Sequence, residues 1–223
     1  MQSIQEFDLL ATHYPEVARI AARYQEPGPQ LTASHAPCPT AKGEFMVDVA
    51  HAILDVDAMS AKAFHKYSIH LLVDFLHRSH RYYLEVYLPR LGRNMEQLST
   101  AYPDEPAITK VLIPLYRQFK DDLLAHILWE EKGLFPYALS LEGHATVAEL
   151  DFEVHTFLDQ HPDHHTELDH MCHLLAQVDQ KYTGDMAFKM LRNRMLQLKA
   201  DLNLHGVIED EVLIAKIREL QRQ

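Results

Sequence analysis

A histidine and a glutamate stand four residues apart at two places in the sequence, as His126 with Glu130 and as His205 with Glu209. A spacing of four places both side chains on one face of a helix, one turn apart. Each pair continues an apolar stripe with the helical period, formed by Leu115, Phe119, Leu123 and Leu134 around the first pair and by Leu191, Met195, Leu198, Leu202 and Val212 around the second. Because a buried glutamate is costly unless it is paired or bound to a metal, the two pairs predict half of a dinuclear cation site.

The other half of this site is expected from two further helical segments. His77 follows Val73 by about one helical period, and His165 leads into an apolar stripe that continues with Leu168. His164 is the main alternative to His165, and the residues alone leave that choice open. The resulting set of four histidines and two glutamates suits iron, whereas a closed structural zinc site prefers four ligands that are often thiolates.

Two acidic residues repeat the same spacing, since Asp122 precedes His126 by four residues and Asp201 precedes His205 by four. A metal-bound imidazole usually donates its free N–H to a carboxylate, a carbonyl or water, so these acids are predicted acceptors. An ordinary solvated acid is the alternative for each of them. The other histidines near the stripes are interpreted as hydrogen-bond partners of the ligands or as surface residues, namely His70, His80, His155, His170 and His173.

Four long helical segments are expected to carry these side chains. They run over about residues 63–98, 104–139, 161–182 and 185 to near the C-terminus. Pro89 is expected to bend the first segment, and Pro136 is expected to bend or end the second. Short connections between four such segments predict an all-α fold, an antiparallel up-down four-helix bundle.

The first 60 residues are predicted to form a small helical N-terminal segment, and residues 61–223 the bundle. A second short helix is expected to begin at Pro15, because proline is favoured in the first helical turn. Residues 26–43 contain four prolines and two glycines, which predicts a linker. Another short helix is expected over residues 44–59.

The net charge of −11 argues against binding to nucleic acid, which needs a basic face. No apolar run is long enough to cross a membrane, and the N-terminus lacks the basic and apolar blocks of a signal peptide. A soluble, cytoplasmic protein is therefore expected. Cys38 and Cys172 stand in unrelated contexts and predict neither a disulfide framework nor a metal clamp.

Four stretches that contain these residues resemble the helix motifs of the hemerythrin-like, HHE cation-binding superfamily, in order. They are HRSHRYY at 77–83, HILWEEKGLFPY at 126–137, HHTELDHMCHLLAQVDQKY at 164–182 and LHGVIEDEVL at 204–213. The most similar branch is the repair-of-iron-centres group, also described as regulators of cell morphogenesis and nitric oxide signalling. The resemblance covers about residues 63–222.

This resemblance implies an antiparallel four-helix bundle around two non-haem iron ions, bridged by oxo and carboxylate groups. The family's ligand positions carry onto His77, His126, Glu130, His165, His205 and Glu209. The family-like distance to Tyr182 favours His165 over His164.

The implied function is a response to nitrosative or oxidative stress, through reaction with nitric oxide or oxygen or through support of iron–sulfur cluster repair. The expected partners are a diatomic ligand, with iron–sulfur protein clients as further candidates, whereas the oligomeric state has no signal in the sequence. An oxygen-binding carrier or sensor without turnover is the alternative, and a metal-stabilised scaffold is a third. The chain departs from the repair group because the Cys-Cys pair of that group's N-terminal domain is absent, and because LIAK at 213–216 stands where the family usually has Leu-Phe-x-Pro.

Overall fold

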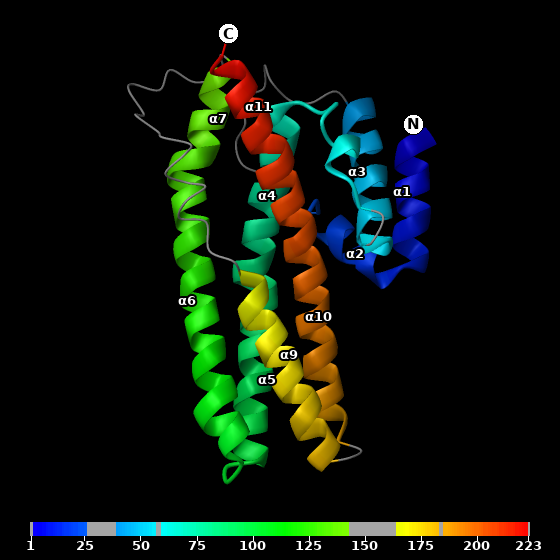
Figure 1. Cartoon of the computed structure of the whole chain (residues 1–223). Coiled ribbons are helices and arrows are strands. Elements are labelled where there is room, and N and C mark those ends of the chain that lie inside the picture. The colour runs from blue at the N-terminus through cyan, green and yellow to red at the C-terminus, as the bar shows by residue number, and fades with distance from the viewer. Residues whose placement is uncertain (1, 26–38, 57–58, 143–163, 183–184, 223) are drawn as a thin grey trace. The chain divides into compact units, whose positions relative to one another are not determined.

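A computed structural model gives the structure of residues 2–25, 39–56, 59–142, 164–182 and 185–222. Every regular element in these ranges is a helix, as Figure 1 shows, which confirms the all-α prediction. The described residues form two compact units. As far as they are described, unit 1 takes in Met1–His80, Trp129–Asp159 and Asn203–Gln223, and unit 2 takes in Arg81–Leu128 and Gln160–Leu202. The domain boundary expected at residue 60 stays a prediction.

Unit 1 contains the N-terminal helices and the C-terminal end of the chain. Its elements are α1 (Gln2–His13), α2 (Pro15–Ala22), α3 (Pro39–Leu54), the 3-10 helix η3 (Ala61–Ala63), most of α4 (Ile69–Tyr82), the π-helical segment η6 (Glu130–Leu134), α7 (Phe135–Leu141), the π-helical segment η7 (Val207–Leu213) and α11 (Ile214–Leu220). The predicted helix start at Pro15 is confirmed. Helix α3 begins at Pro39, earlier than the expected start near residue 44, and the predicted linker residues 26–38 lie outside the described part.

Aromatic packing joins α3 to α4 within unit 1. Phe45 of α3 makes edge contacts with Phe64 and Phe75 at ring-centroid distances of 5.9 and 5.5 Å. Such edge-to-face pairs add stabilisation to the burial of the rings. Helix α1 approaches α3 at Gly43, where a Cβ atom would meet Ile4 Cγ1 at 2.9 Å, so the glycine allows the close approach.

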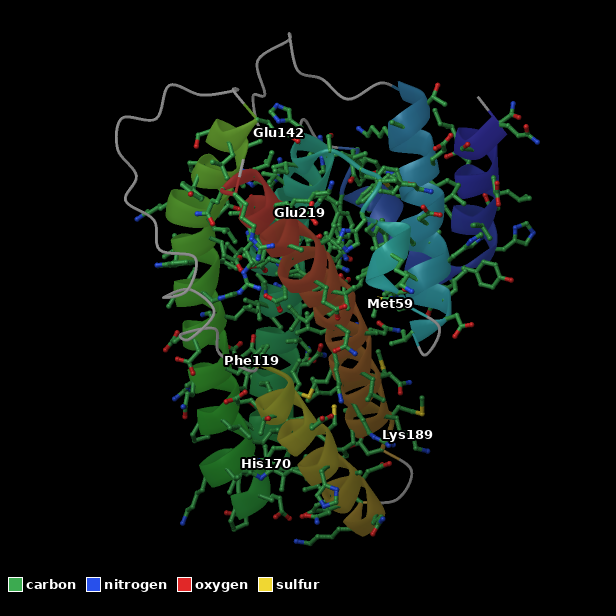
Figure 2. The ribbon with its side chains drawn as sticks, turned by 45° about the horizontal axis from the view of Figure 1, so that its top comes forward. Met59, Phe119, Glu142, His170, Lys189 and Glu219 are labelled. Carbon is green, nitrogen blue, oxygen red and sulfur yellow. The ribbon has the colours of Figure 1, made fainter. Side chains whose placement is uncertain are left out.

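The end of α7 is tied to the beginning of α4, also within unit 1. The backbone N–H of Ile69 donates to Glu142 Oε1 at 3.1 Å, and Figure 2 labels this glutamate. The first N–H groups of a helix have no partner within the helix, so the glutamate satisfies one of them. This contact helps to fix the start of α4, the helix that carries His77 and His80.

Unit 2 is a four-helix bundle around one core. Its segments are the π-helical η4 (Tyr83–Tyr87) with α5 (Leu88–Ala101), the π-helical η5 (Ala107–Leu112) with most of α6 (Ile113–Trp129), α9 (His164–Lys181), and most of α10 (Met186–Gly206). All four segments supply buried side chains, including Leu91, Met95, Leu98, Leu112, Phe119, Leu123, Leu168, Met171, Leu175, Phe188, Leu191, Met195 and Leu198. The short connections at 102–106 and 182–185 make α5 antiparallel to α6 and α9 antiparallel to α10. The predicted antiparallel helical bundle is therefore confirmed.

Prolines at three points of the chain are accommodated within continuous helices. Pro89, Pro114 and Pro136 each occupy the second position of an α-helix that directly follows a π-helical segment. A proline within a helix cannot donate to the carbonyl four residues before it, and its ring clashes with that carbonyl. We attribute the π-helical segments η4, η5 and η6 to this clash, because their wider i to i+5 hydrogen bonding makes room for the ring, whereas η7 has no proline after it. Pro136 therefore does not end its helix, which continues to Leu141.

The remaining boundaries follow local capping. The first long helix begins at Ile69 rather than near Ala63, because Ser60 caps the separate 3-10 helix η3 by accepting from the Lys62 N–H. The fourth helical segment begins after Asp185, as predicted, and Asp185 Oδ1 accepts from the Ala187 N–H at 2.8 Å. The expected start of the third helix at residue 161 lies outside the described residues. Among the helices that are described, none has the length and the apolar character that crossing a membrane requires.

The substitution Phe119→Ala is expected to lower the free energy of unfolding by about 3–5 kcal/mol, because this ring is fully buried in the core of unit 2 (Figure 2). Chemical denaturation monitored by circular dichroism measures this loss. Gln118→Ala is the matched control, since Gln118 is exposed on the same helix and its loss should stay within about 0.5 kcal/mol. Equal losses for the two variants would contradict the packing described for unit 2.

Candidate metal centre

Four ionisable side chains meet in the interior of unit 1. They are His80 of α4, Glu130 at the start of η6, His205 of α10 and Glu209 of η7, and we call them the buried cluster. The two glutamates have no exposed surface, and His80 and His205 are only 2% and 5% exposed. Burial of two carboxylates at one place requires compensating positive charge or hydrogen bonds.

The distances within the buried cluster are those of direct polar contacts. His80 Nε2 lies 2.8 Å from Glu130 Oε2 and 3.2 Å from His205 Nε2. His205 Nε2 lies 3.3 Å from Glu209 Oε2. His80, Glu130 and His205 each offer one ligand atom within 4.8 Å of the others, which is close enough for one cation to contact all three.

Two π-helical segments supply the glutamates. Glu130 is the first residue of η6 and Glu209 lies near the start of η7. A π-helical turn shifts the following side chains around the helix axis relative to a regular α-helix, and such turns occur frequently at functional sites. The widened turn at η6 begins at Glu130, so it shifts the side chains that follow this residue.

Charge within the buried cluster is balanced through His80. Burial alone would lower the pKa of His80, but hydrogen bonds to Glu130 and Glu131 outweigh it and raise this pKa to about 9. Burial, together with the negative charge of Glu209, raises the pKa of Glu130 to about 7. Burial lowers the pKa of His205. At neutral pH His80 is therefore the imidazolium that offsets the buried carboxylates, and His205 is neutral.

Glu131 contacts two histidines of α4, one with each carboxylate oxygen. Its Oε1 lies 2.8 Å from His80 Nδ1, and its Oε2 lies 3.0 Å from His77 Nε2. Burial would raise the pKa of Glu131, but the contacts with His77 and His80 lower it to about 2. The ring of Phe135 stacks on His80, with centroids 5.3 Å apart. His80 is thus held by a carboxylate at Nδ1 and by an aromatic ring on one face.

Within unit 1 the structure brings the predicted ligands Glu130, His205 and Glu209 together. His126 is half-buried on α6, one helical turn before Glu130. His77 is 38% exposed and contacts Glu131. His164 and His165 lie in the first turn of α9, and their side chains are outside the described residues. The ligand set as a whole stays a prediction.

The acids at the repeated spacing have different surroundings in the structure. Asp201 is buried and accepts from the Tyr83 hydroxyl at 2.9 Å within unit 2, whereas Asp122 is exposed. Their predicted roles toward His205 and His126 stay predictions. Glu131, which is not among the predicted acceptors, does contact a histidine of the buried cluster, since its Oε1 lies 2.8 Å from His80 Nδ1.

His80 is the one residue of the buried cluster that is not among the six predicted ligands. A signal for it exists in the sequence, because Leu72, Leu76, His80, Tyr83 and Tyr87 follow the helical period, and all five are buried. The predicted ligand His77 belongs to a neighbouring stripe, which runs through Val73 and Leu84. His77 and Leu84 lie on the more exposed side of that helix in the structure.

Comparison with known proteins gives an independent view of this site. Residues 71–163 match the family model described as the hemerythrin HHE cation binding domain. This match confirms that the stretch is similar to the hemerythrin-like, HHE cation-binding proteins. The matched stretch includes His77, His80, His126 and Glu130, whereas His205 and Glu209 lie beyond it. The domain's description as cation binding agrees with the donor chemistry of the buried cluster.

A distant relative is the iron-sulfur cluster repair protein ScdA of Staphylococcus haemolyticus (strain JCSC1435), which is 25% identical over 114 residues. The alignment covers 51% of this chain and 51% of the relative, so the chain spans about half the length of the curated relative that it matches. No solved structure matches the chain. Together with the family match, this relative confirms the resemblance to hemerythrin-like proteins and to iron-centre repair proteins.

The melting temperature of the chelator-treated domain is expected to fall as the pH rises from 7 to 9. The pKa of His80 is about 9 in the folded protein against an ordinary value of 6.5, so its protonation stabilises the fold fully below pH 6.5 and is lost as the pH passes 9. Calorimetry of the wild type and of His80→Gln measures this difference. The same fall in both proteins would show that His80 does not carry the positive charge.

Proposed function

We propose that this chain is a non-haem di-iron protein of the nitrosative and oxidative stress response, which reacts with nitric oxide or oxygen or supports iron–sulfur cluster repair. The observation that carries the proposal is the buried cluster, in which two carboxylates without exposed surface lie beside two buried imidazoles. Burying such a set is costly in a protein that has no ion to bind there. The hemerythrin HHE match and the repair protein ScdA support the same class of centre.

The donor atoms of the proposed centre suit iron. Glu130 and Glu209 supply carboxylate oxygens that can bridge two ions, and His205 supplies an imidazole nitrogen. His126 and His165 complete the set as predicted from the sequence. Mixed imidazole and carboxylate ligands are characteristic of non-haem iron sites, whereas closed zinc sites favour four ligands.

We assign the ligand from α4 to His80, in place of the predicted ligand His77. His80 Nε2 already points at Glu130 and His205, at 2.8 and 3.2 Å. His77 is more exposed, and its Nε2 contacts Glu131 outside the buried cluster. The assignment keeps four histidines and two glutamates in the centre.

In the proposed centre the metal and the protein would have separate roles. When bound, iron would supply the redox chemistry toward a small diatomic molecule, and the chain would supply its position and surroundings. Glu130 and Glu209 would hold the ions deep in unit 1, where burial limits access of water. Phe135, stacked on His80, adds an apolar wall on that side.

Protein purified without chelator is expected to contain two irons per chain, and Glu130→Ala and Glu209→Ala are expected to lose most of this iron. Each substitution removes a proposed bridging carboxylate and leaves buried histidines without their partner. Elemental analysis measures the metal content, and Glu85→Ala is the control, because Glu85 is an exposed carboxylate paired with Arg81. Wild-type protein with one zinc and no iron, even after anaerobic reconstitution, would exclude the di-iron proposal.

The same measurement decides the ligand from α9. His165→Ala should reduce the iron content, whereas His164→Ala should not. The two positions differ by about 100° around the helix axis, so only one of them can face the centre. The reverse result would move the ligand by one residue and leave the rest of the proposal unchanged.

The reduced protein is expected to react with nitric oxide and to restore activity to a dehydratase whose iron–sulfur cluster has been damaged by oxidation. Anaerobic stopped-flow absorption against nitric oxide and against oxygen measures the first reaction, and recovery of dehydratase activity measures the second. The Glu130→Ala variant serves as the iron-deficient control. Reversible oxygen binding without any recovery of the dehydratase would instead identify an oxygen carrier or sensor.

A further inference from the structure

Both carboxylate oxygens of Glu131 contact histidines of another helix, α4. Oε1 lies 2.8 Å from His80 Nδ1 and Oε2 lies 3.0 Å from His77 Nε2. The two histidines are three residues apart on α4, so they share one helix face. The carboxylate is therefore held at both oxygens by a single, rigid helix.

The contact at Nδ1 decides what the other nitrogen of His80 can do. A histidine that donates its Nδ1–H keeps Nε2 for another partner, and the hydrogen-bond partner thereby selects the tautomer. In the structure Nε2 faces Glu130 Oε2 at 2.8 Å and His205 Nε2 at 3.2 Å. His80 thus turns one nitrogen to Glu131 and the other to the buried cluster.

We propose that Glu131 and His77 are positioning residues, which hold the His80 ring so that its Nε2 faces the cation. This inference rests on the proposed function, because it needs a cation at the buried cluster. Glu131 accepts from His80 directly, and His77 acts one step further out by donating to the second oxygen of Glu131. His77 then supports a ligand and is not itself one.

The exposure of the three side chains fits this order. His80 is 2% exposed, the Glu131 side chain 21% and the His77 side chain 38%. A ligand needs to be buried with its ion, whereas a supporting residue can lie at the edge of unit 1. Such supporting partners typically change metal affinity by about ten- to a hundredfold.

Ferrous ion affinity, measured anaerobically by competition with a chelator, tests the proposal. Glu131→Gln should weaken binding by about ten- to a hundredfold, because the amide can no longer accept from both histidines. His80→Gln should weaken binding further, since it removes a ligand. His77→Gln should retain most of the affinity, because its amide N–H can still donate to Glu131, and His77→Ala should lose more than His77→Gln.

The proton NMR spectrum of the cobalt(II) protein tests the positioning role directly, because a residue that only stabilises the fold would not change the signals of the ligand histidines. A ring N–H of a ligand histidine gives a shifted proton signal that exchanges with solvent in the cobalt protein. One such signal should disappear or shift strongly in Glu131→Gln and remain in His77→Gln. Glu85→Gln, which changes an exposed carboxylate paired with Arg81, is the matched control and should behave as the wild type in both experiments.

The outcomes separate this inference from the proposed function. Loss of affinity in His77→Gln as large as in His80→Gln would make His77 a ligand and overturn the inference, while the di-iron proposal would stand. Unchanged affinity in Glu131→Gln would also overturn it. Wild-type protein that binds no ferrous ion would overturn both. If Glu131→Gln does not fold, the comparison of His77→Gln with His77→Ala still decides, because only the positioning role predicts rescue by the amide.

Discussion

Two carboxylates with no exposed surface, Glu130 and Glu209, are the constraint on which the interior of unit 1 depends. A buried carboxylate loses its hydration, so it has to be paired with a positive or donating group or become neutral. Both responses occur here, since the pKa of Glu130 is raised to about 7 by burial and by Glu209, while His80 lies 2.8 Å from its Oε2. The polar contacts of α4, η6, α10 and η7 inside unit 1 follow from this requirement.

The backbone also bears on these contacts. Pro136 is placed where a regular helix would clash with its ring, and the π-helical turn before it begins at Glu130. The consecutive residues Glu130 and Glu131 both contact His80, Glu130 at Nε2 and Glu131 at Nδ1. A proline six residues away thus belongs to the physical explanation of the site, although it makes no contact that defines the cluster. Pro136 acts through the π-helical turn of η6, which changes the direction of the side chains that follow the turn.

Much of the fold and part of the site could be predicted from the sequence, because hydrophobic periodicity reports burial. Glu130, His205 and Glu209 interrupt apolar stripes, and all three are buried. Periodicity alone offers both His77 and His80, because one stripe runs through Val73, His77 and Leu84 and another runs through Leu72, Leu76 and His80. Residues Ile69 to Leu76 of α4 are all buried, so that part of the helix has no single apolar face from which to extrapolate. Hydrophobic periodicity does not locate the π-helical turns either, since they shift the period within a helix.

His80 links the stability of the fold to the capacity for binding a cation. As an imidazolium it offsets the charge of the buried carboxylates. A cation at the buried cluster would carry more positive charge than this proton, and it would need the Nε2 lone pair that the proton occupies. Binding must therefore release the proton, and affinity should increase with pH over the range in which His80 titrates. One side chain thus explains both how the carboxylates are tolerated in the interior and why they remain available to an ion.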